Sequence, residues 1–353
     1  MRKSVVVCLI TIAVFALSFL FESCSKDASI FNAQPIQFFI PSKTLPPQVP
    51  SPSDNQPTKA GVELGRFLFY DSILSLDYTI SCGSCHHQSN AFSDPVRYSK
   101  GVDGTLGTRH AMALFNLAWD PTYFWDGRVS TLEEQALKPI EDPLEMKSDL
   151  NVVLKRLNNS AFYREKFFNA FGTTQITASY LAKALSQFER SIISANSKYD
   201  KFSRGEIQLD SVELEGRNLF TNEEKGDCTH CHSLGSLFSD FGFKNNGLDL
   251  VPSDSGRYKV TGFAGDIGKF KSPTLRNIAL TAPYMHDGRF ATLDKVLEHY
   301  NIGFKQSPTL DGNIAKHIKA RMTIPETKAI IAFLKTLTDS TLITNPAYSN
   351  PFK

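Results

Sequence analysis

Two short stretches of the sequence each bring two thiols and an imidazole close together. The first is SCGSCHHQ, residues 81–88, and the second is DCTHCHSL, residues 227–234. Both contain the pattern Cys-x-x-Cys-His. Its members are Cys82, Cys85 and His86 in the first stretch and Cys228, Cys231 and His232 in the second. Groups of this kind could bind zinc, form a redox-active disulfide or hold a haem.

The spacing and its repetition favour covalent haem attachment. Two thiols so spaced can add across the haem vinyl groups, and the adjacent histidine then lies under the iron as its proximal ligand. A zinc site built from both pairs would have to bridge the roughly 140 residues between Cys85 and Cys228, far more than in a zinc ribbon. A thioredoxin-like pair normally accompanies a βαβ pattern, which is not evident. We therefore predict two covalently bound haem c groups, with His86 and His232 on the irons.

The N-terminal segment is typical of an exported protein. Arg2 and Lys3 precede an apolar run over residues 5–21. Residues 1–24 are therefore interpreted as an export signal, and Cys24 as the lipidated first residue of a mature lipoprotein, although the residues before it depart from the usual lipobox. A plain cleaved signal and an uncleaved anchor are the alternatives. The predicted location is periplasmic or otherwise exported, with a membrane tether through a lipidated Cys24.

The composition of residues 25–59 and the overall charge indicate a tether and argue against a nucleic-acid partner. Seven prolines lie between positions 35 and 57 among Ser, Gln and Asn, which favours an extended tether over a packed element. The formal net charge is +2 at pH 7 without a long basic run, so no nucleic-acid partner is expected. The 353 residues, 41% of them hydrophobic, are enough for two packed domains.

The Cys-x-x-Cys-His motifs are part of a longer internal repeat. GVELGRFLFYD at 61–71 precedes the first motif, and VELEGRNLFTN at 212–222 precedes the second. Downstream, YFWDGRVSTLEE at 123–134 matches YMHDGRFATLDK at 284–295 without a gap. This pattern indicates a duplicated haem domain.

Apolar residues recur at helical spacing in both copies, and strand-like alternation is scarce. We expect helices in VELGRFLF, TLEEQALKPI, NVVLKRL, ASYLAKALSQFERSI and ETKAIIAFLKTL. Gly- and Asp-rich stretches such as 239–269 should be ordered loops around haem. The predicted fold is mainly α, with two tandem cytochrome c-type haem domains and long ordered loops. The N-terminal haem domain covers 60–205, and the C-terminal haem domain covers 206–345.

The repeat also predicts that the two irons differ. A proximal histidine leaves one axial position on each iron, and the sixth group separates electron transfer from catalysis. In the gap-free alignment Trp125 falls on His286, and Pro139 falls on Tyr300. A phenol can ligate iron, whereas a proline ring cannot. We therefore expect the first haem to be open to peroxide and the second to be closed by Tyr300.

Peroxide cleavage further requires a group that moves a proton from the inner to the outer oxygen. Glu145, which follows Pro139 closely, is the candidate for this role. Gln135, one turn before Pro139, is a candidate for orienting bound peroxide or water, and Trp125 is a candidate electron relay between the haems. In the simpler interpretation, Glu145 belongs to a solvated acidic loop and Trp125 is only a packed core residue.

A non-enzymatic interpretation stays open as well. If Met112, Met146 or Met285 supplies a thioether ligand, the chain would be a dihaem electron-transfer cytochrome. Met146 lies 60 residues after His86, a reasonable distance for a ligand in a small cytochrome domain. Such a protein would have two six-coordinate haems and no reactivity toward peroxide.

These motifs resemble the bacterial di-haem cytochrome c peroxidases, a superfamily that includes MauG-type enzymes, which oxidise a protein substrate. The resemblance covers roughly residues 60–340. CGSCH, FWDGRVSTLEEQALKPIEDPLEM, CTHCH, SPTLRNIALTAPYMHDGRFATL and EHYN occur in family order. The resemblance implies a peroxidatic first haem and an electron-transferring second haem, with Trp125 between them and Gln135, Pro139 and Glu145 in the distal pocket.

The activity that the resemblance implies is the reduction of hydrogen peroxide to water. The electrons would come from a small redox protein, a cytochrome c or a cupredoxin. The alternative within the superfamily is a MauG-like dihaem oxidase that modifies a partner protein. A homodimer is the implied assembly.

The sequence departs from the typical peroxidases of this superfamily at three places. Where they carry a distal histidine, the matching position here is Val102, so the first haem should need no reductive opening. Where they carry a methionine on the second haem, this chain has Tyr300, as MauG-type enzymes do, and a phenolate should lower that iron's potential. The family's interdomain calcium would take the carbonyl oxygens of Thr281 and Pro283, but His110 replaces its asparagine ligand. Histidine is a poor ligand for a hard cation, so calcium is left open.

Overall fold

The computed structural model describes residues 33–38, 40–41, 43–47, 49–235, 237–316 and 321–353. The predicted export signal, residues 1–24, lies outside this part of the chain. The described residues are mainly helical, as expected, and their one sheet pairs β1 (Phe243–Lys244) with β2 (Phe270–Lys271) in antiparallel orientation. No helix of the described residues is both long enough and apolar enough to cross a membrane.

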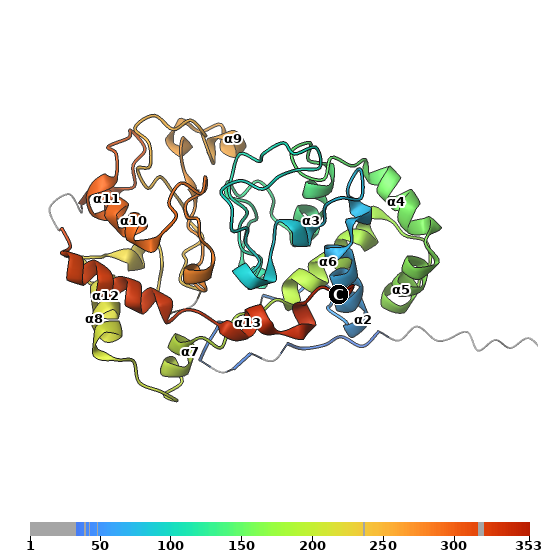
Figure 1. Cartoon of the computed structure of the whole chain (residues 1–353), viewed down its shortest axis with the longest axis horizontal. Helices are drawn as coiled ribbons and strands as arrows, with labels where there is room; N and C mark the ends of the chain where they lie inside the picture. Colours follow the sequence, from blue (N-terminus) through green and yellow to red (C-terminus); the bar gives the residue numbers. More distant parts are fainter. Residues whose placement is uncertain (1–32, 39, 42, 48, 236, 317–320) are drawn as a thin grey trace, which may run out of the picture. The chain divides into compact units, whose positions relative to one another are not determined.

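Two groups of helices follow each other along the chain (Figure 1), and we call residues 59–205 the first half and 206–339 the second half. The first half contains α2 (Lys59–Tyr70), α3 (Leu132–Glu141), α4 (Leu150–Asn159), α5 (Ala161–Phe171), α6 (Ala178–Ser191) and α7 (Lys198–Ser203). The second half contains α8 (Ser211–Thr221), α9 (Tyr258–Thr261), α10 (Leu293–Glu298), α11 (Gly312–Lys316) and α12 (Ile324–Lys335), and α13 (Ser340–Thr344) follows it. A π-helical turn, His299–Gly303, continues α10. Short 3-10 turns lie at Ser72–Leu74, Cys82–Ser84, Gln88–Asn90, Leu117–Trp119, Cys228–His230, Ala264–Asp266, Ile278–Leu280 and Pro346–Tyr348.

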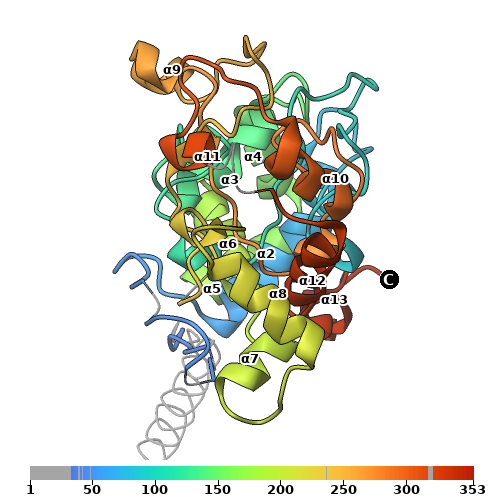
Figure 2. The same cartoon turned by 90° about the vertical axis from the view of Figure 1, so that its left-hand side faces the viewer.

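A pair of packed helices organises each half, and a glycine lies at each contact. In the first half α2 packs against α6, and in the second α8 packs against α12 (Figure 1, Figure 2). A Cβ atom on Gly65 would lie 2.0 Å from the carbonyl oxygen of Ala184, and one on Gly216 would lie 1.9 Å from that of Ala329. Glycine is needed where two backbones approach this closely. The two copies of the repeated helix therefore pack in the same way.

There are two hydrophobic cores, one for each half, and Tyr199 of α7 packs in the core of the second half. An edge-to-face pair of phenylalanine rings joins the packed helices, with Phe69 and Phe188 at 5.2 Å between centroids in the first half, and Phe220 and Phe333 at 5.3 Å in the second. The chain crosses back at its end, because Leu342 of α13 is 1% exposed within the core of the first half. The C-terminal segment thus stabilises the N-terminal half.

The loops around the two DGR motifs exchange backbone hydrogen bonds between the halves. The nitrogen of His110 donates to the carbonyl oxygen of His286, and the nitrogen of Lys271 donates to that of Trp125, each at 2.8 Å. Trp125 and His286 are the positions that the sequence repeat aligns. Each half therefore donates a backbone hydrogen bond to the equivalent repeat position of the other half.

Arginine side chains repeat this exchange. The Arg97 Nε atom donates to the carbonyl oxygen of Asp287, and an Arg257 Nη atom donates to that of Asp126, each at 2.8 Å. Each of these aspartates also accepts hydrogen bonds from the arginine of its own DGR motif. The interface between the halves is therefore reciprocal, as in a dimer of two related modules.

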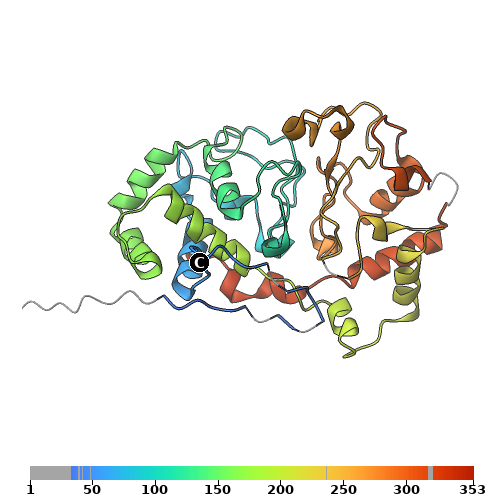
Figure 3. The ribbon, with the colours of Figure 1, turned by 180° about the vertical axis from the view of Figure 1, so that it is seen from behind.

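The proline-rich segment, predicted as an extended tether, packs against the two halves over its described residues between 33 and 58 (Figure 3). Arg276 donates to the carbonyl oxygen of Thr44 at 3.1 Å, and the indole of Trp119 donates to two of the segment's proline carbonyls. Asn55 is 2% exposed and hydrogen-bonded to α6. The segment has little regular secondary structure, and its carbonyl groups accept hydrogen bonds from the two halves, which composition alone does not indicate.

The helices expected from apolar periodicity are all present, as α2, α3, α4, α6 and α12. α5 was not predicted, because the aromatic residues of AFYREKFFNAF are spread around the helix and mark its buried face poorly. The stretch 239–269 is mostly loop, as expected, with β1 and α9 as short regular elements. The expected boundary near Gly205 lies just after α7, where Gly205 has a φ of 80°.

Candidate active site

The two Cys-x-x-Cys-His motifs adopt the same local structure. Each forms a short 3-10 turn that begins at the first cysteine. The backbone nitrogen of the histidine donates to that cysteine's carbonyl oxygen, at 2.9 Å for His86 and 2.8 Å for His232. The Nδ1 atom of His86 lies 2.9 Å from the carbonyl oxygen of Phe92, and that of His232 lies 3.0 Å from the carbonyl oxygen of Phe238.

These hydrogen bonds orient both imidazoles for metal binding. A neutral histidine whose Nδ1 donates to a carbonyl keeps the lone pair of Nε2 for a metal. Burial lowers the pKa of His86 to about 4 and also lowers the pKa of His232, so both rings are neutral at pH 7. The thiols are free, and burial raises their pKa, to about 11 for Cys85 and Cys231. A neutral imidazole beside two free thiols is a donor set that fits haem c.

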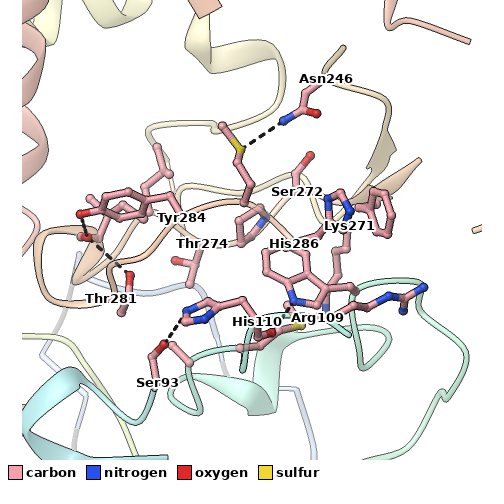
Figure 4. A pocket seen from close by; sticks show the side chains of 18 of the residues that line it. Ser93, Arg109, His110, Asn246, Lys271, Ser272, Thr274, Thr281, Tyr284 and His286 are labelled. Atoms are coloured by element: carbon pink, nitrogen blue, oxygen red, sulfur yellow. Dashed lines mark hydrogen bonds between the residues drawn. The ribbon is translucent and has the colours of Figure 1, made fainter. Parts of the chain in front are cut away.

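Both motifs open into one cavity of about 870 Å³ that residues of the two halves line together (Figure 4). A volume of this size lies within the range of cofactor and small-molecule sites. Every predicted site residue except Cys82 lines this cavity. The structure thus brings together residues that are separated by more than 200 positions, such as Cys85 and Tyr300.

α3 carries Gln135 and Pro139 into the part of the cavity that belongs to the first half. Thr131 caps the helix, and after its end a turn places Glu145 in the same cavity wall. The backbone nitrogen of Met146 donates to the carbonyl oxygen of Pro139 at 3.1 Å and closes this turn. The Oε1 atom of Gln135 is buried without a hydrogen-bond partner among the described residues. Its acceptor capacity is therefore available to a bound molecule.

Glu145 is the titratable group of this wall. Burial raises the pKa of Glu145 to about 7, with the charge of Asp142 acting in the same direction and that of Arg128 opposing it. A carboxyl group that is half ionised near pH 7 suits proton transfer in both directions. Val102 is joined to this turn, because its backbone nitrogen donates to the carbonyl oxygen of Glu145 at 3.0 Å. The valine side chain offers no atom that could ligate iron.

The corresponding wall of the second half contains Tyr300 in the π-helical turn His299–Gly303. Turns of this kind are rare and often occur at functional sites. The amide of Asn246 donates to the Tyr300 hydroxyl and to the Met285 sulfur, each at 3.3 Å, and Figure 4 shows the amide pointing at the thioether. Burial raises the pKa of Tyr300 to about 12, while the hydrogen bond from Asn246 acts to lower it.

The three methionines considered as haem ligands lie in different surroundings. Met112 and Met285 line the cavity. Met146 is 3% exposed and packs in the hydrophobic core of the first half. Its thioether therefore belongs to the core and does not line the cavity.

Trp125 lies where the two halves meet. Its indole Nε1 donates to the carbonyl oxygen of His110, and its own carbonyl oxygen accepts from the backbone nitrogen of Lys271, each at 2.8 Å. The side chain of Lys271, 3% exposed, forms an ion pair with Asp120 across the same boundary. These contacts hold Trp125 at the border of the two halves, where it lines the shared cavity.

His110 stands at the position of the implied calcium ligand. Its ring is 5% exposed, with Nε2 at 3.2 Å from the Ser93 hydroxyl and Nδ1 at 3.2 Å from the carbonyl oxygen of Val96 (Figure 4). Burial lowers the pKa of His110, although the carbonyl groups of Val96 and Thr281 act to raise it. A neutral imidazole that hydrogen-bonds to these oxygens does not fit a site for a hard, oxygen-seeking cation.

Sequence reasoning missed a cluster at the border of the halves. The ring of His286 stacks on the ring of Phe270 at 3.6 Å between centroids, and the guanidinium of Arg109 lies 5.4 Å from the centre of the Phe270 ring. Arg109 also forms ion pairs with Asp126 at 2.6 Å and Asp254 at 2.7 Å. The repeated DGR motif was a signal for Asp126. Asp254 lies in a loop without a counterpart in the first half, and Asn246 likewise carried no signal.

A family model described as di-haem cytochrome c peroxidase matches residues 59–208. Cytochrome c551 peroxidase of Nitrosomonas europaea is 38% identical over 282 residues, which cover 78% of this chain and 79% of that protein. The methylamine utilization protein MauG of Methylorubrum extorquens is 35% identical over 296 residues, which cover 83% of this chain and 82% of that protein. A solved structure of a MauG-like protein associated with microbial copper homeostasis matches with a TM-score of 0.83 and 36% identity, covering 90% of this chain and 100% of that chain.

The fold, the paired motifs and these similarities define a di-haem c-type oxidoreductase. The chain belongs to the di-haem cytochrome c peroxidase family. This confirms the family that the motifs predicted and, with it, the predicted class of enzyme, a haem peroxidase.

Proposed function

We propose that this chain is an exported di-haem peroxidase that reduces hydrogen peroxide to water with electrons from a small redox protein. One haem c would be attached to Cys82 and Cys85 with His86 on its iron, and the other to Cys228 and Cys231 with His232 on its iron. When bound, the haem irons supply the centres that bind peroxide and exchange electrons. The observation that carries the proposal is a carboxyl group poised near pH 7, that of Glu145, in a cavity shared with both motifs.

Glu145 moves the proton in this proposal. As a carboxylate it takes the proton from the inner oxygen of peroxide, and as the acid it returns that proton to the outer oxygen, so that the O–O bond breaks and the outer oxygen leaves as water. Two electrons from the redox donor and two protons from solvent convert the inner oxygen to the second water. The Oε1 atom of Gln135, which has no hydrogen-bond partner in the described part of the chain, accepts a hydrogen bond from peroxide or water and so orients it. Pro139 and Val102 offer no ligating atom, so the peroxidatic centre needs no reductive opening.

The second half passes electrons to the first. With a haem bound beside His232, the Tyr300 phenol would ligate its iron and keep peroxide away, which would leave that centre to electron exchange. Trp125, fixed between the halves by two hydrogen bonds, connects the two centres. The electron donor would be a cytochrome c or a cupredoxin that docks outside the cavity.

A second candidate function is the oxidation of a partner protein, as in MauG-like enzymes. Tyr300 and Val102 favour it, because a phenol ligand and the missing distal histidine set this chain apart from the typical peroxidases. The 35% identity to a MauG protein supports the same possibility. The site would be unchanged, and the electrons would come from a side chain of the partner instead of a redox donor.

The remaining assignments concern organisation and location. The haem domains would be the two helical groups, with boundaries near those expected at 60–205 and 206–345. The protein would be periplasmic or otherwise exported, held at the membrane through a lipidated Cys24, which lies outside the described residues. A homodimer is the proposed assembly. Calcium is left out, because Thr281 and Pro283 offer carbonyl groups but His110 does not fit a hard cation.

The test is electron paramagnetic resonance of the purified, fully oxidised protein before and after one equivalent of peroxide, without prior reduction. A high-spin signal beside a low-spin one, both changing with peroxide, is expected for one open and one closed haem. Two low-spin signals that do not respond would contradict the proposal and would indicate an electron-transfer cytochrome. Peroxide turnover with a reduced cytochrome c, measured next to oxidation of candidate proteins, separates the two enzyme functions.

A further inference from the structure

Asn246 makes two hydrogen bonds that the proposed mechanism does not use. Its Nδ2 atom donates to the Met285 sulfur and to the Tyr300 hydroxyl, each at 3.3 Å. These three residues line the same cavity as His232. A phenol and a thioether can each serve as an axial ligand of haem iron, so one amide group holds two candidate ligands side by side.

The surrounding loop holds Asn246 in place. Its backbone oxygen accepts from the His299 ring at 3.0 Å, and His299 directly precedes Tyr300 in the π-helical turn. The neighbouring Asn245, 2% exposed, donates to the Ser307 hydroxyl at 2.9 Å. Asn246 is therefore anchored to the turn that carries the Tyr300 phenol. Because the residue has little freedom to move, its amide can fix the positions of the two candidate ligands.

We propose that Asn246 is a positioning residue that makes Tyr300, and not Met285, the ligand of the second haem; this rests on the proposed function, which places a haem beside His232. A hydrogen bond to the phenol oxygen stabilises the negative charge that this oxygen carries as a ligand. A hydrogen bond to the sulfur engages the lone pairs that the thioether would need for iron. Both bonds act in the same direction.

The arrangement belongs to the second half alone. The repeat aligns Met285 with Phe124 and Tyr300 with Pro139. The aligned positions of the first half therefore offer neither of the two ligands. Selection between a phenol and a thioether is needed only where both are present, which is where the structure places Asn246.

The experiment compares purified dihaem protein carrying Asn246→Leu with the wild type and with Asn158→Leu. Asn158 is a matched control, because it is also a hydrogen-bonding amide, with bonds of 2.8 and 2.9 Å to carbonyl groups, but it lies in α4 of the first half. The readouts are the low-spin resonance signal, the near-infrared charge-transfer band of thioether-ligated ferric haem, and the reduction potential of the second haem.

In Asn246→Leu we expect the tyrosine-type signal to be replaced, wholly or in part, by a thioether-type one. The equilibrium between ferric and ferrous iron should shift toward ferrous by about tenfold, which corresponds to about 59 mV for one electron. Adding Met285→Leu should abolish the thioether band, and Asn158→Leu should resemble the wild type. An Asn246→Leu protein with wild-type spectra and potential would overturn the proposal.

A second variant covers a failure of Asn246→Leu to fold. Asn246→Asp keeps the shape of the side chain but has no N–H group, so the same direction of change is expected, and wild-type signals would again refute the inference. Peroxide turnover does not enter the test. A protein that is inactive with peroxide but has a tyrosine-ligated haem sensitive to Asn246 would refute the proposed function and support this inference. A thioether-type spectrum in the wild type would overturn the inference directly.

Discussion

The backbone N–H of Lys271 donates to the carbonyl oxygen of Trp125 across the border of the two halves, at 2.8 Å. The indole of Trp125 is held at its other end by the carbonyl oxygen of His110. Trp125 is therefore held by its backbone to the second half and by its ring to the first half. A group that passes electrons between the halves gains from such rigidity, because its distance to each side stays constant.

Replacing Trp125 by Phe should slow electron transfer between the two haems by roughly tenfold or more, an increase of about 1.4 kcal/mol in the barrier. Haem content and both resting spectra should stay close to those of the wild type. Stopped-flow reduction of the peroxide-treated protein measures the step. Trp119→Phe is the control, because Trp119 is the chain's other tryptophan and donates to the proline-rich segment. Equal rates in the two variants would remove Trp125 from the path.

Glu145→Gln should lower peroxide turnover by about 10²–10⁴-fold, the usual contribution of a general acid–base group. Both haems should stay attached. Glu189→Gln is a matched control, since burial also raises the pKa of Glu189, to about 8, but its side chain does not line the cavity. Turnover in Glu145→Gln that equals that in Glu189→Gln would show that Glu145 moves no proton.

The pH dependence of turnover follows from the raised pKa of Glu145, about 7. The carboxylate form accepts the proton from peroxide, so kcat/KM should fall as the pH drops through about 7 and the group becomes protonated. Asp142→Asn removes a neighbouring charge that raises the pKa of Glu145, and should therefore move the acidic limb to lower pH. A limb that stays in place in this variant would assign the titration to another group.

Calcium should have no effect on the wild-type protein. Chelation or addition of calcium is expected to leave turnover, haem spectra and the midpoint of thermal unfolding unchanged, because the His110 ring takes up the Val96 carbonyl oxygen and the Ser93 hydroxyl as hydrogen-bond partners. Differential scanning calorimetry with and without a chelator makes the measurement. A calcium-dependent rise in the midpoint would show that the ion binds despite this ring.

Gly216→Ala should destabilise the protein by about 1–3 kcal/mol, the usual cost of overpacking a core. The added methyl group would lie 1.9 Å from the carbonyl oxygen of Ala329 and force α8 away from α12. Gly312→Ala is the control, because a Cβ atom there meets nothing within 4 Å. Urea denaturation of both variants checks the difference. Equal midpoints would mean that α8 and α12 can move apart without a loss in the free energy of unfolding.

Much of this molecule could be predicted because its signals are local. The five periodic segments became helices, and the spacing of the cysteines and histidines indicated haem before any contact was known. The repeat aligned Pro139 with Tyr300, since both follow a DGR motif by the same distance, and both residues line the cavity. Such features depend on neighbours along the chain, which the sequence displays.

The features that escaped prediction depend on partners that are distant in sequence. The proline-rich segment offers carbonyl groups to Arg276 and Trp119, which lie far along the chain. Asn246 matters only because Met285 and Tyr300 both come within 3.3 Å of its amide. The His110 ring could be seen as an odd substitution in the sequence, but its hydrogen bonds to Ser93 and Val96 come from the folded loops.

The exchange of contacts between the halves has a consequence for how the two sites could diverge. Two identical subunits around a two-fold axis must carry the same residue at equivalent positions, so a change that suits one site is imposed on the other. Here both modules are encoded in one chain, and a codon can change on one side only. Proline at 139 and tyrosine at 300, or phenylalanine at 124 and methionine at 285, are differences that a symmetric assembly could not hold. The reciprocal interface between the two halves is kept as it would be in a dimer, while natural selection acts on each site separately.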